Sequence, residues 1–314
     1  MTDARAIAEE TARASYGRLV AYLAARTRDI AAAEDALGDA FAAALAHWPV
    51  SGVPTSPEAW LLTAARRKLI DNARRAQTRR ISEPDILLAI EEAEAMTAED
   101  KFVDERLKLL FICAHPAIDA TVRTPLMLQT VLGLDAARIA SAFLVAPATM
   151  GQRLVRAKKK ISDARISFEA PPQEALQERA AAVLDAIYAA YNAGYDCDDG
   201  SGLTEEALFL ARLASNLLPQ NAEAQGLLAL FCYIEARRNA RRANGVYVPL
   251  DAQDPGLWEK SLLDEADKAL ARAAPLYAPG RYQYEAAIQS AHIFGGLSGE
   301  NVNDAVIRLY DRLI

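Results

Sequence analysis

Two groups of basic side chains are the residues of this sequence best suited to binding chemistry. The first group comprises Arg66, Arg67, Lys68, Arg74, Arg75, Arg79 and Arg80, with only Asp71 opposing it. The second comprises Arg153, Arg156, Lys158, Lys159, Lys160 and Arg165, with only Asp163 opposing it. Clustered Lys and Arg neutralise phosphates and release counterions when they bind a nucleic acid. Either group alone is typical of a solvated helix face, but two groups in one chain favour nucleic-acid binding.

The second basic group lies in a pattern that predicts two short crossed helices. We expect a first helix over 136–143, a turn at Leu144 and Val145, and a second helix that begins at Pro147. The outer face of the second helix then carries Thr149, Gln152, Arg153 and Arg156. Gln and Arg on such a face can read base edges in a major groove. Because a leucine occupies the turn where glycine is common, a plain helical hairpin stays an alternative.

The elements that must position these residues are helices. Alanine is abundant, alternating β-branched runs are missing, and apolar residues recur at three- and four-residue steps, so the sequence predicts an all-α fold. The 314 residues are enough for two or three domains, and 52% hydrophobic and 25% charged residues exclude a wholly disordered chain. No apolar run is long enough to span a membrane.

Charge and loop residues divide the chain into parts. Residues 1–175 carry as many basic as acidic side chains, so the net charge of −7 lies in the C-terminal part. Acidic residues dominate 81–101, which we interpret as a linker. We therefore predict a helical module over 1–80, a second over 102–168, and a third over 174–314 that follows Pro171 and Pro172.

Three strings resemble the sigma-70 family of RNA polymerase sigma factors, in the extracytoplasmic-function subgroup that keeps regions two and four. AAAEDALGDAF at 31–41 resembles the region-two helix that docks on the polymerase clamp. PEAWLLTAARRKLIDNARR at 57–75 is similar to the helix that melts and reads the −10 element. GLDAARIASAFLVAPATMGQRLVRAKKKI at 133–161 resembles the region-four helix-turn-helix that reads the −35 element. Order and spacing of the three strings match the family.

This resemblance implies three sets of site residues. Polymerase-binding residues would be Glu34, Asp35, Leu37, Asp39 and Phe41, although an amphipathic core helix is the alternative for this segment. Residues that bind the −10 element would be Trp60, Arg66, Arg67, Lys68, Asn72, Arg74 and Arg75, with a core role favoured for Trp60. Arg67 stands where the family commonly has a polar residue such as asparagine. Residues that bind the −35 element would be Thr149, Gln152, Arg153, Arg156 and Lys159.

The C-terminal module resembles the tetratricopeptide-like extension of one extracytoplasmic-function subgroup. The strings FICAHPAI at 111–118 and YNAGY at 191–195 are similar to that subgroup. Residues 217–224 match a helix end, a turn and the next helix start of a tetratricopeptide unit, and 262–282 give a weaker copy. The resemblance implies that residues 176–314 regulate the sigma modules, either by packing on them or by binding a regulatory protein.

Other sites have little support in the sequence. Cys113 and His115 lack further metal-ligating neighbours, and the acidic run at 196–200 does not fit a calcium loop, so we expect no metal. No nucleophilic triad or phosphate-binding glycine loop is visible, so we expect no enzyme and no cofactor. Widely spaced cysteines and the absence of a signal peptide predict a cytoplasmic protein.

We therefore expect a transcription initiation factor whose partners are core RNA polymerase and promoter DNA, with no membrane association. Two alternatives stay open. One is a helical-repeat scaffold whose N-terminal helices are structural. The other is a helix-turn-helix DNA-binding regulator that does not bind polymerase. Polymerase binding by residues 31–41 separates the first reading from both alternatives.

Overall fold

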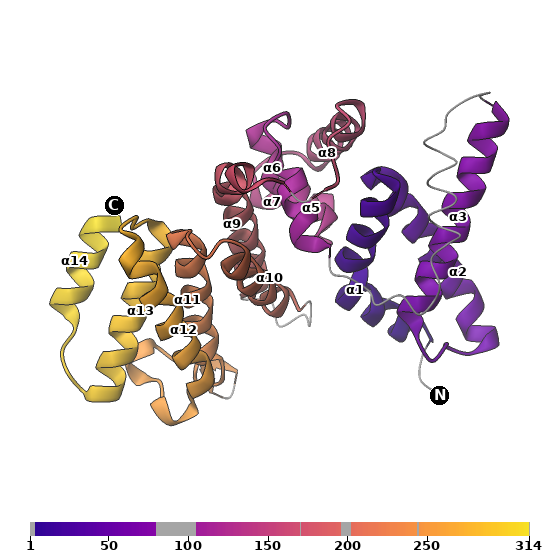
Figure 1. Cartoon of the computed structure of the whole chain (residues 1–314). Helices are drawn as coiled ribbons and strands as arrows, with labels where there is room; N and C mark the ends of the chain where they lie inside the picture. The colour runs from indigo at the N-terminus through magenta and orange to yellow at the C-terminus, as the bar shows by residue number, and fades with distance from the viewer. Residues whose placement is uncertain (1–3, 80–104, 170, 196–201, 244, 314) are drawn as a thin grey trace. The chain divides into compact units, whose positions relative to one another are not determined.

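The computed structural model describes residues 4–79, 105–169, 171–195, 202–243 and 245–313, and these residues are almost entirely helical (Figure 1). The predicted all-α fold is therefore confirmed. The chain forms two compact units. The first comprises residues 1–186 and 192–203, and the second comprises residues 187–191 and 204–314. The predicted linker over 81–101 lies outside the described residues.

Three long helices begin the first unit: α1 (Ala4–Thr27), α2 (Ile30–Ser51) and α3 (Pro57–Arg79). The Asp29 carboxylate accepts from the backbone N–H of Ala32 at 3.0 Å and so caps α2. Gly52 ends α2 with a φ of 84°, a backbone conformation that glycine adopts without a Cβ clash. The large side chains fully buried in this bundle include Leu19, Leu23, Leu37, Trp48 and Leu61.

Four shorter helices follow in the same unit: α5 (Arg106–Cys113), α6 (Ala120–Thr130), α7 (Ala136–Ala142) and α8 (Pro147–Asp163). Asp119 and Asp135 cap α6 and α7 with their side chains. The predicted helices on either side of Leu144 are thus observed within a residue or two of their expected bounds. One face of α8 is buried and consists of Met150, Leu154, Ala157 and Ile161.

Helix α9 (Gln173–Tyr195) contributes to both units. In the first unit, the Arg179 guanidinium donates to the carbonyl oxygen of Phe111 at 3.1 Å, and Leu176 and Ala180 are buried. In the second unit, the ring of Tyr191 stacks on Phe231 with centroids 4.0 Å apart. The helix therefore supplies core residues on both sides of the boundary.

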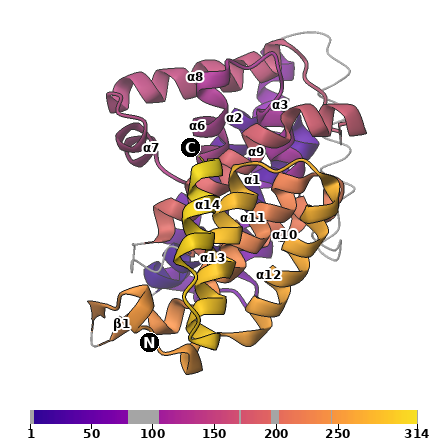
Figure 2. The same ribbon diagram turned by 90° about the vertical axis from the view of Figure 1, so that its left-hand side faces the viewer.

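The second unit contains α10 (Leu203–Leu217), α11 (Ala222–Ala236), α12 (Lys260–Ala273), α13 (Arg281–Ser298) and α14 (Asn303–Leu313) (Figure 2). The predicted helix end, turn and helix start near residue 220 is observed, and Asn221 caps α11. Helix α11 packs against α12 and α13 and is buried on nearly all sides. Membership of a repeat class stays a prediction.

A short antiparallel hairpin, β1 (Arg242–Ala243) and β2 (Val246–Tyr247), interrupts the helices of the second unit between α11 and α12. Gly245, with a φ of 79°, lies in the turn between its strands. Three single-turn 3-10 helices flank the hairpin between residues 238 and 257. This segment explains why the helical pattern does not repeat at a constant interval here.

Candidate functional site

The outer face of α2 is lined by small and acidic side chains. Its exposed residues include Ala31, Asp35, Gly38, Asp39, Ala42, Leu45, Ala46 and Pro49. A Cβ added at Gly38 would meet no atom of the described residues within 4 Å. An exposed glycine inside a helix costs about 1 kcal/mol relative to alanine, and no contact within the described residues compensates for it here. Gly38 therefore leaves a part of this face without a side chain.

The residues of α2 that were predicted to bind polymerase differ in how exposed their side chains are. Asp35 is exposed and Phe41 is half-buried. Asp39 is exposed and forms an ion pair of 3.0 Å with Lys68 of α3. The prediction for Leu37 is wrong, because its side chain is 0% exposed in the core between the helices. An apolar residue with no exposed surface cannot anchor a partner.

Glu34, next to Asp35, faces a different neighbour. Its carboxylate forms an ion pair with Lys158 of α8. Burial raises the pKa of the Glu34 carboxyl above its usual range, while the nearby Lys158 ammonium acts in the opposite direction. Burial and the negative charges of Glu34 and Asp35 also raise the pKa of the Tyr16 hydroxyl. Glu34 is therefore engaged inside the first unit.

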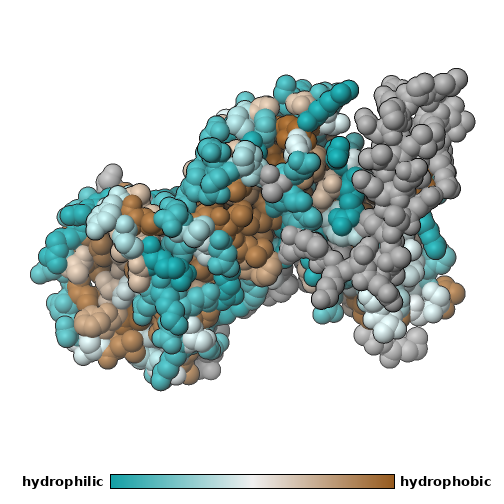
Figure 3. Space-filling view, in the orientation of Figure 1, coloured by the Kyte–Doolittle hydropathy of each residue, from teal (hydrophilic) through white to brown (hydrophobic). Residues whose placement is uncertain are grey.

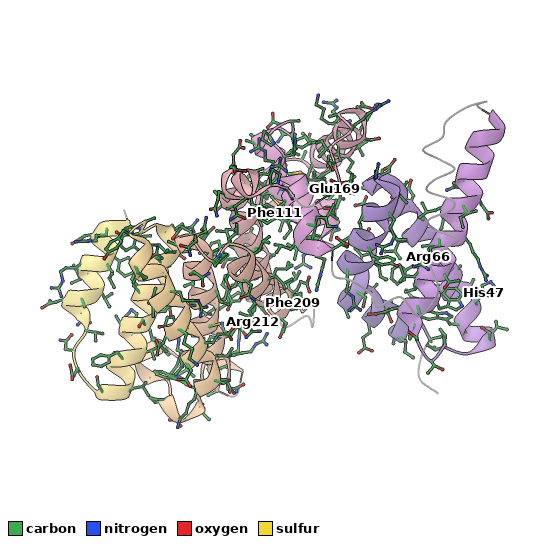
Figure 4. The ribbon with its side chains drawn as sticks, viewed as in Figure 1. His47, Arg66, Phe111, Glu169, Phe209 and Arg212 are labelled. Atoms are coloured by element: carbon green, nitrogen blue, oxygen red, sulfur yellow. The ribbon has the colours of Figure 1, made fainter. Side chains whose placement is uncertain are left out.

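Two of the predicted DNA-binding cations of α3 hold the helices of the bundle together. The Arg66 guanidinium donates to the Tyr22 hydroxyl at 2.6 Å and lies 5.5 Å from the centroid of the same ring (Figure 4). Tyr22 itself is 1% exposed, so this contact joins α3 to the buried side of α1. Lys68 pairs with Asp39 of α2. These two side chains have structural roles that the sequence pattern did not indicate.

The remaining predicted residues of α3 divide by exposure. Arg67 and Asn72 are exposed on the helix surface. Trp60 is half-buried and packs edge-on against Trp48, with ring centroids 5.6 Å apart, which agrees with the favoured core role. Arg74 and Arg75 lie on α3, but their side chains are outside the described residues.

Helix α8 presents its predicted residues together on the surface. All five side chains predicted to bind the −35 element are exposed: Thr149, Gln152, Arg153, Arg156 and Lys159. Lys159 also pairs with Asp163 at 2.8 Å, and both side chains are more than half exposed. An apolar side chain that sequence reasoning missed, Val155, is 66% exposed in the same helix. At helical spacing it lies beside Gln152 and Lys159 on the outward face.

The turn before α8 is strained. Leu144 has a φ of 54° and a side chain that is 93% exposed. A non-glycine residue in this left-handed region costs roughly 1–2 kcal/mol. Ala146 provides no side-chain cap for α8, and Pro147 occupies the first turn. The turn therefore lacks both the glycine and the capping side chain that usually favour such a geometry.

Comparison with known proteins finds a family that resembles the N-terminal bundle. The family described as Sigma-70 region 2 matches residues 12–79, which include most of α1 and all of α2 and α3. The N-terminal part of the chain is therefore similar to region 2 of the sigma-70 family. Residues 179–274 match a family of unknown function, DUF6596. The uncharacterized protein R00370 of Rhizobium meliloti (strain 1021) is 38% identical over 289 residues, covering 88% of this chain and 67% of that protein, and the two belong to one family. No solved structure is significantly similar to the chain.

The match to region 2 indicates what the exposed faces of this bundle bind. Sigma-70 region 2 is part of transcription initiation factors that bind RNA polymerase, and the match indicates a role of that kind for the N-terminal bundle. Helices α2 and α3 of region 2 carry the two predicted faces, one for polymerase and one for DNA. Gly38 was missed at the sequence level, although an isolated glycine within a helical pattern is a signal of a packing or binding position.

Metal-binding and reactive sites find no support in the part of the chain that the structure describes. No group of three His, Cys, Asp or Glu side chains there is placed to hold a metal ion. Cys113 is buried with its sulfur 3.6 Å from the Thr130 hydroxyl, and burial raises the pKa of this thiol to about 12. No described helix is long and apolar enough to cross a membrane.

Proposed function

We propose that this protein is a transcription initiation factor of the extracytoplasmic-function type. It binds core RNA polymerase through the outer face of α2, contacts the −10 element through α3, and contacts the −35 element through α8. The observation that carries the proposal is the region 2 match over residues 12–79, combined with the exposed face of α2 within it.

The shape of the α2 face supports a helical partner. Exposed alanines at positions 31, 42 and 46 and the glycine at position 38 lie at the helical spacing that forms one stripe. Small residues in such a stripe let another helix approach closely, and Leu45, which is 48% exposed, supplies an apolar contact. Asp35 and Asp39 flank the stripe and favour a basic partner surface.

The outward face of α8 has the chemistry for reading a major groove. Gln152 can pair with adenine and Arg156 with guanine, each through two hydrogen bonds. Val155 lies between them in sequence and can contact the methyl group of thymine. Lys159 adds a phosphate contact. Arg67 and Asn72, exposed on α3, supply the corresponding polar contacts to the −10 element.

Asp35→Arg tests the polymerase face. A surface substitution away from packing changes stability by less than about 0.5 kcal/mol, so the variant should fold. Its affinity for core RNA polymerase, measured by pull-down or light scattering, should fall at least about tenfold, which is 1.4 kcal/mol. Glu10→Arg, another exposed carboxylate on the N-terminal bundle, is the matched control and should bind as well as the parent chain. Equal affinities for all three chains would contradict the proposal.

The C-terminal unit modulates this activity in our proposal. The support is that α9 supplies buried residues to the first unit and to the second, so a change in the second unit acts on a helix that the first unit needs. The acidic net charge of the C-terminal part offers a second route, through competition with DNA for basic helices at close range.

The truncation that tests modulation must respect α9. A chain ending at residue 175 loses Leu176 and Ala180 from the first unit, and each fully buried leucine stabilises by about 1.5–3 kcal/mol. A chain ending at residue 203 keeps them. We expect the shorter chain to unfold at lower urea concentration than the longer one. Transcription by the longer truncation that matches the full chain would contradict modulation by the C-terminal unit.

A further inference from the structure

Three basic side chains surround the turn between α5 and α6, outside the faces assigned to polymerase and promoter contacts. His115 lies in the turn itself, Arg123 comes from the following helix α6, and Arg179 comes from α9. All three belong to the first unit and are half-buried. The turn is part of the string FICAHPAI at 111–118, to which the proposed function gives no role. We call these three side chains the turn cluster.

The backbone of the turn holds both guanidinium groups of the cluster in place. Arg179 donates to the carbonyl oxygen of Phe111 at 3.1 Å, at the start of this string (Phe111 is labelled in Figure 4). Arg123 donates from Nε to the carbonyl oxygen of Ile118 at 2.9 Å, at the end of the string. Two arginines from different helices are thus anchored to the turn that carries His115.

The positive charges of the turn cluster are not neutralised by ion pairs with the described residues. Glu178 is close enough to act on Arg179 and His115, but it forms no ion pair with either. Burial lowers the pKa of the His115 imidazole, and the charges of Arg179 and Arg123 lower it further. Burial also lowers the pKa of the Arg179 guanidinium, and the Arg123 charge acts in the same direction. An anion bound among these like charges would therefore be stabilised.

Each side chain of the cluster keeps hydrogen-bond donors for such an anion. A guanidinium carries several N–H donors, of which Arg179 gives one to the turn and Arg123 gives two. The Nδ1 atom of His115 accepts from the backbone N–H of Ala117 at 3.1 Å, so the neutral ring carries its proton on Nε2. Planar guanidinium groups and an imidazole N–H are the donors that suit the oxygens of a phosphate group.

The turn cluster lies next to the exposed face of α8. Hydrogen bonds from Thr121 lower the pKa of the Asp119 carboxyl, and the charges of Arg153 and Arg123 act in the same direction. Asp119 is therefore near one arginine of the cluster and one arginine predicted to bind the −35 element. Figure 3 shows hydrophilic side chains along the edge that α8 forms, at the top of the view. A phosphate group can reach the cluster as part of DNA bound on α8 or as a free phosphate compound.

We propose that His115, Arg123 and Arg179 form a binding site for a phosphate group. The inference goes beyond the proposed function, because inorganic phosphate alone tests it whether or not the chain binds a promoter. Bound phosphate places a negative charge beside the imidazole, which favours its protonated form and so raises the pKa of His115.

The titration of His115 in the full chain gives the first test. The chain has three histidines, and NMR follows each ring separately. The variant His115→Asn identifies the resonance of His115 by its loss. Inorganic phosphate, compared with chloride at equal ionic strength, should raise the pKa of His115, while the resonances of His47 and His292 keep their positions. A His115 resonance that does not respond to phosphate would overturn the site.

Three variants make the affinity for inorganic phosphate specific to the cluster. Arg179→Gln removes a charge and its donors and should weaken phosphate binding at least about tenfold in calorimetry. His115→Asn keeps an oxygen that can accept from the Ala117 N–H but removes the Nε2 donor, so it should weaken binding about threefold. Arg138→Gln, which removes an exposed charge on α7, is the matched control and should bind phosphate like the parent chain.

Urea unfolding checks that the variants remain folded. If Arg179→Gln unfolds because its bond to Phe111 is lost, His115→Asn and the titration of the parent chain still test the site. Equal phosphate affinities in the parent chain, Arg179→Gln and His115→Asn would overturn it.

DNA distinguishes the two sources of the phosphate group. If the DNA backbone occupies the cluster, Arg179→Gln should reduce the slope of log affinity against log salt concentration by about one. If the site takes a free phosphate compound, the slope should equal that of the parent chain, although the variant still loses inorganic phosphate. Either result supports the site. A chain that binds phosphate at the cluster but neither DNA nor polymerase would contradict the proposed function and leave the site standing.

Discussion

The two basic groups of this protein differ in what their side chains contact. On α3, Arg66 is bound to the Tyr22 hydroxyl and Lys68 to Asp39, so two of its basic side chains join helices. On α8, the five predicted side chains are exposed, whereas Lys158 pairs with Glu34 of α2. In the sequence, the two groups are similar, because each is a run of Lys and Arg with one opposing Asp.

The difference follows from the neighbours of each helix. Helix α3 packs against both α1 and α2, so basic residues on its inner flanks meet polar atoms of those helices. Helix α8 buries one face formed by residues such as Leu154 and Ile161, with Lys158 beside it, and its opposite face stays in solvent. Charge counting therefore cannot tell Arg66, which joins two helices, from Arg156, which is exposed on α8.

The largest expected effect distinguishes Arg66 from its neighbour Arg67. Arg66→Ala removes a charged hydrogen bond to a buried tyrosine and should lower the free energy of unfolding by roughly 1.5–3 kcal/mol. Arg67→Ala, at an exposed position, should change it by less than about 0.5 kcal/mol while weakening DNA binding. Urea unfolding of the two variants measures this, and equal stabilities would remove the difference between the helices.

Arg156→Ala tests whether the exposed charge of α8 reads bases. The variant should lose about 1–3 kcal/mol of binding to a promoter fragment and should discriminate less at one base pair. Arg5→Ala, an exposed cation on α1, removes the same charge and serves as the control in fluorescence anisotropy. A loss in Arg156→Ala that is the same for every DNA sequence would limit this arginine to phosphate contact.

Gly151→Ala should stabilise α8 by up to about 1 kcal/mol, because a Cβ there meets no atom within 4 Å and alanine has the higher helix propensity. Gly38→Ala should stabilise α2 by a similar amount for the same reason. Thermal unfolding measures both. The larger Gly38→Leu should in addition weaken polymerase binding, whereas unimpaired binding would show that nothing approaches the α2 stripe closely.

The smallest expected effect concerns Val155. A thymine methyl buried against this side chain contributes about 0.8 kcal/mol. Replacing thymine by uracil in the −35 element removes the methyl group and should weaken binding of the parent chain by about that amount. Val155→Ala should show a reduced response to the same replacement. An equal response in both chains would place the methyl contact elsewhere.

The sequence predicted the helices of this protein better than their contacts. Local signals mark the ends of elements, so the sequence predicted the helix start near residue 221 and the start of α8 at Pro147. Helical periodicity also placed Gln152 and Arg156 on an outer face. Each of these inferences depends on residues within about two turns of one another.

Contacts between distant segments could not be predicted in the same way. Periodicity grouped Leu37 with Phe41 but could not tell whether an apolar residue lies in the chain's own core or on a partner. The pairing of Glu34 with Lys158 depends on how two modules pack, and no local pattern records it. Arg66 illustrates the same limit, because Tyr22 is 44 residues away.

The central claim is that the chain directs polymerase to a promoter through region 2 and α8. In vitro transcription with core RNA polymerase on the DNA upstream of the protein's own gene tests it most directly. We predict a transcript from one defined start that requires the full chain and is lost with Asp35→Arg, which remains folded. A chain that neither binds core polymerase nor changes its transcripts, while still binding DNA, would contradict the account.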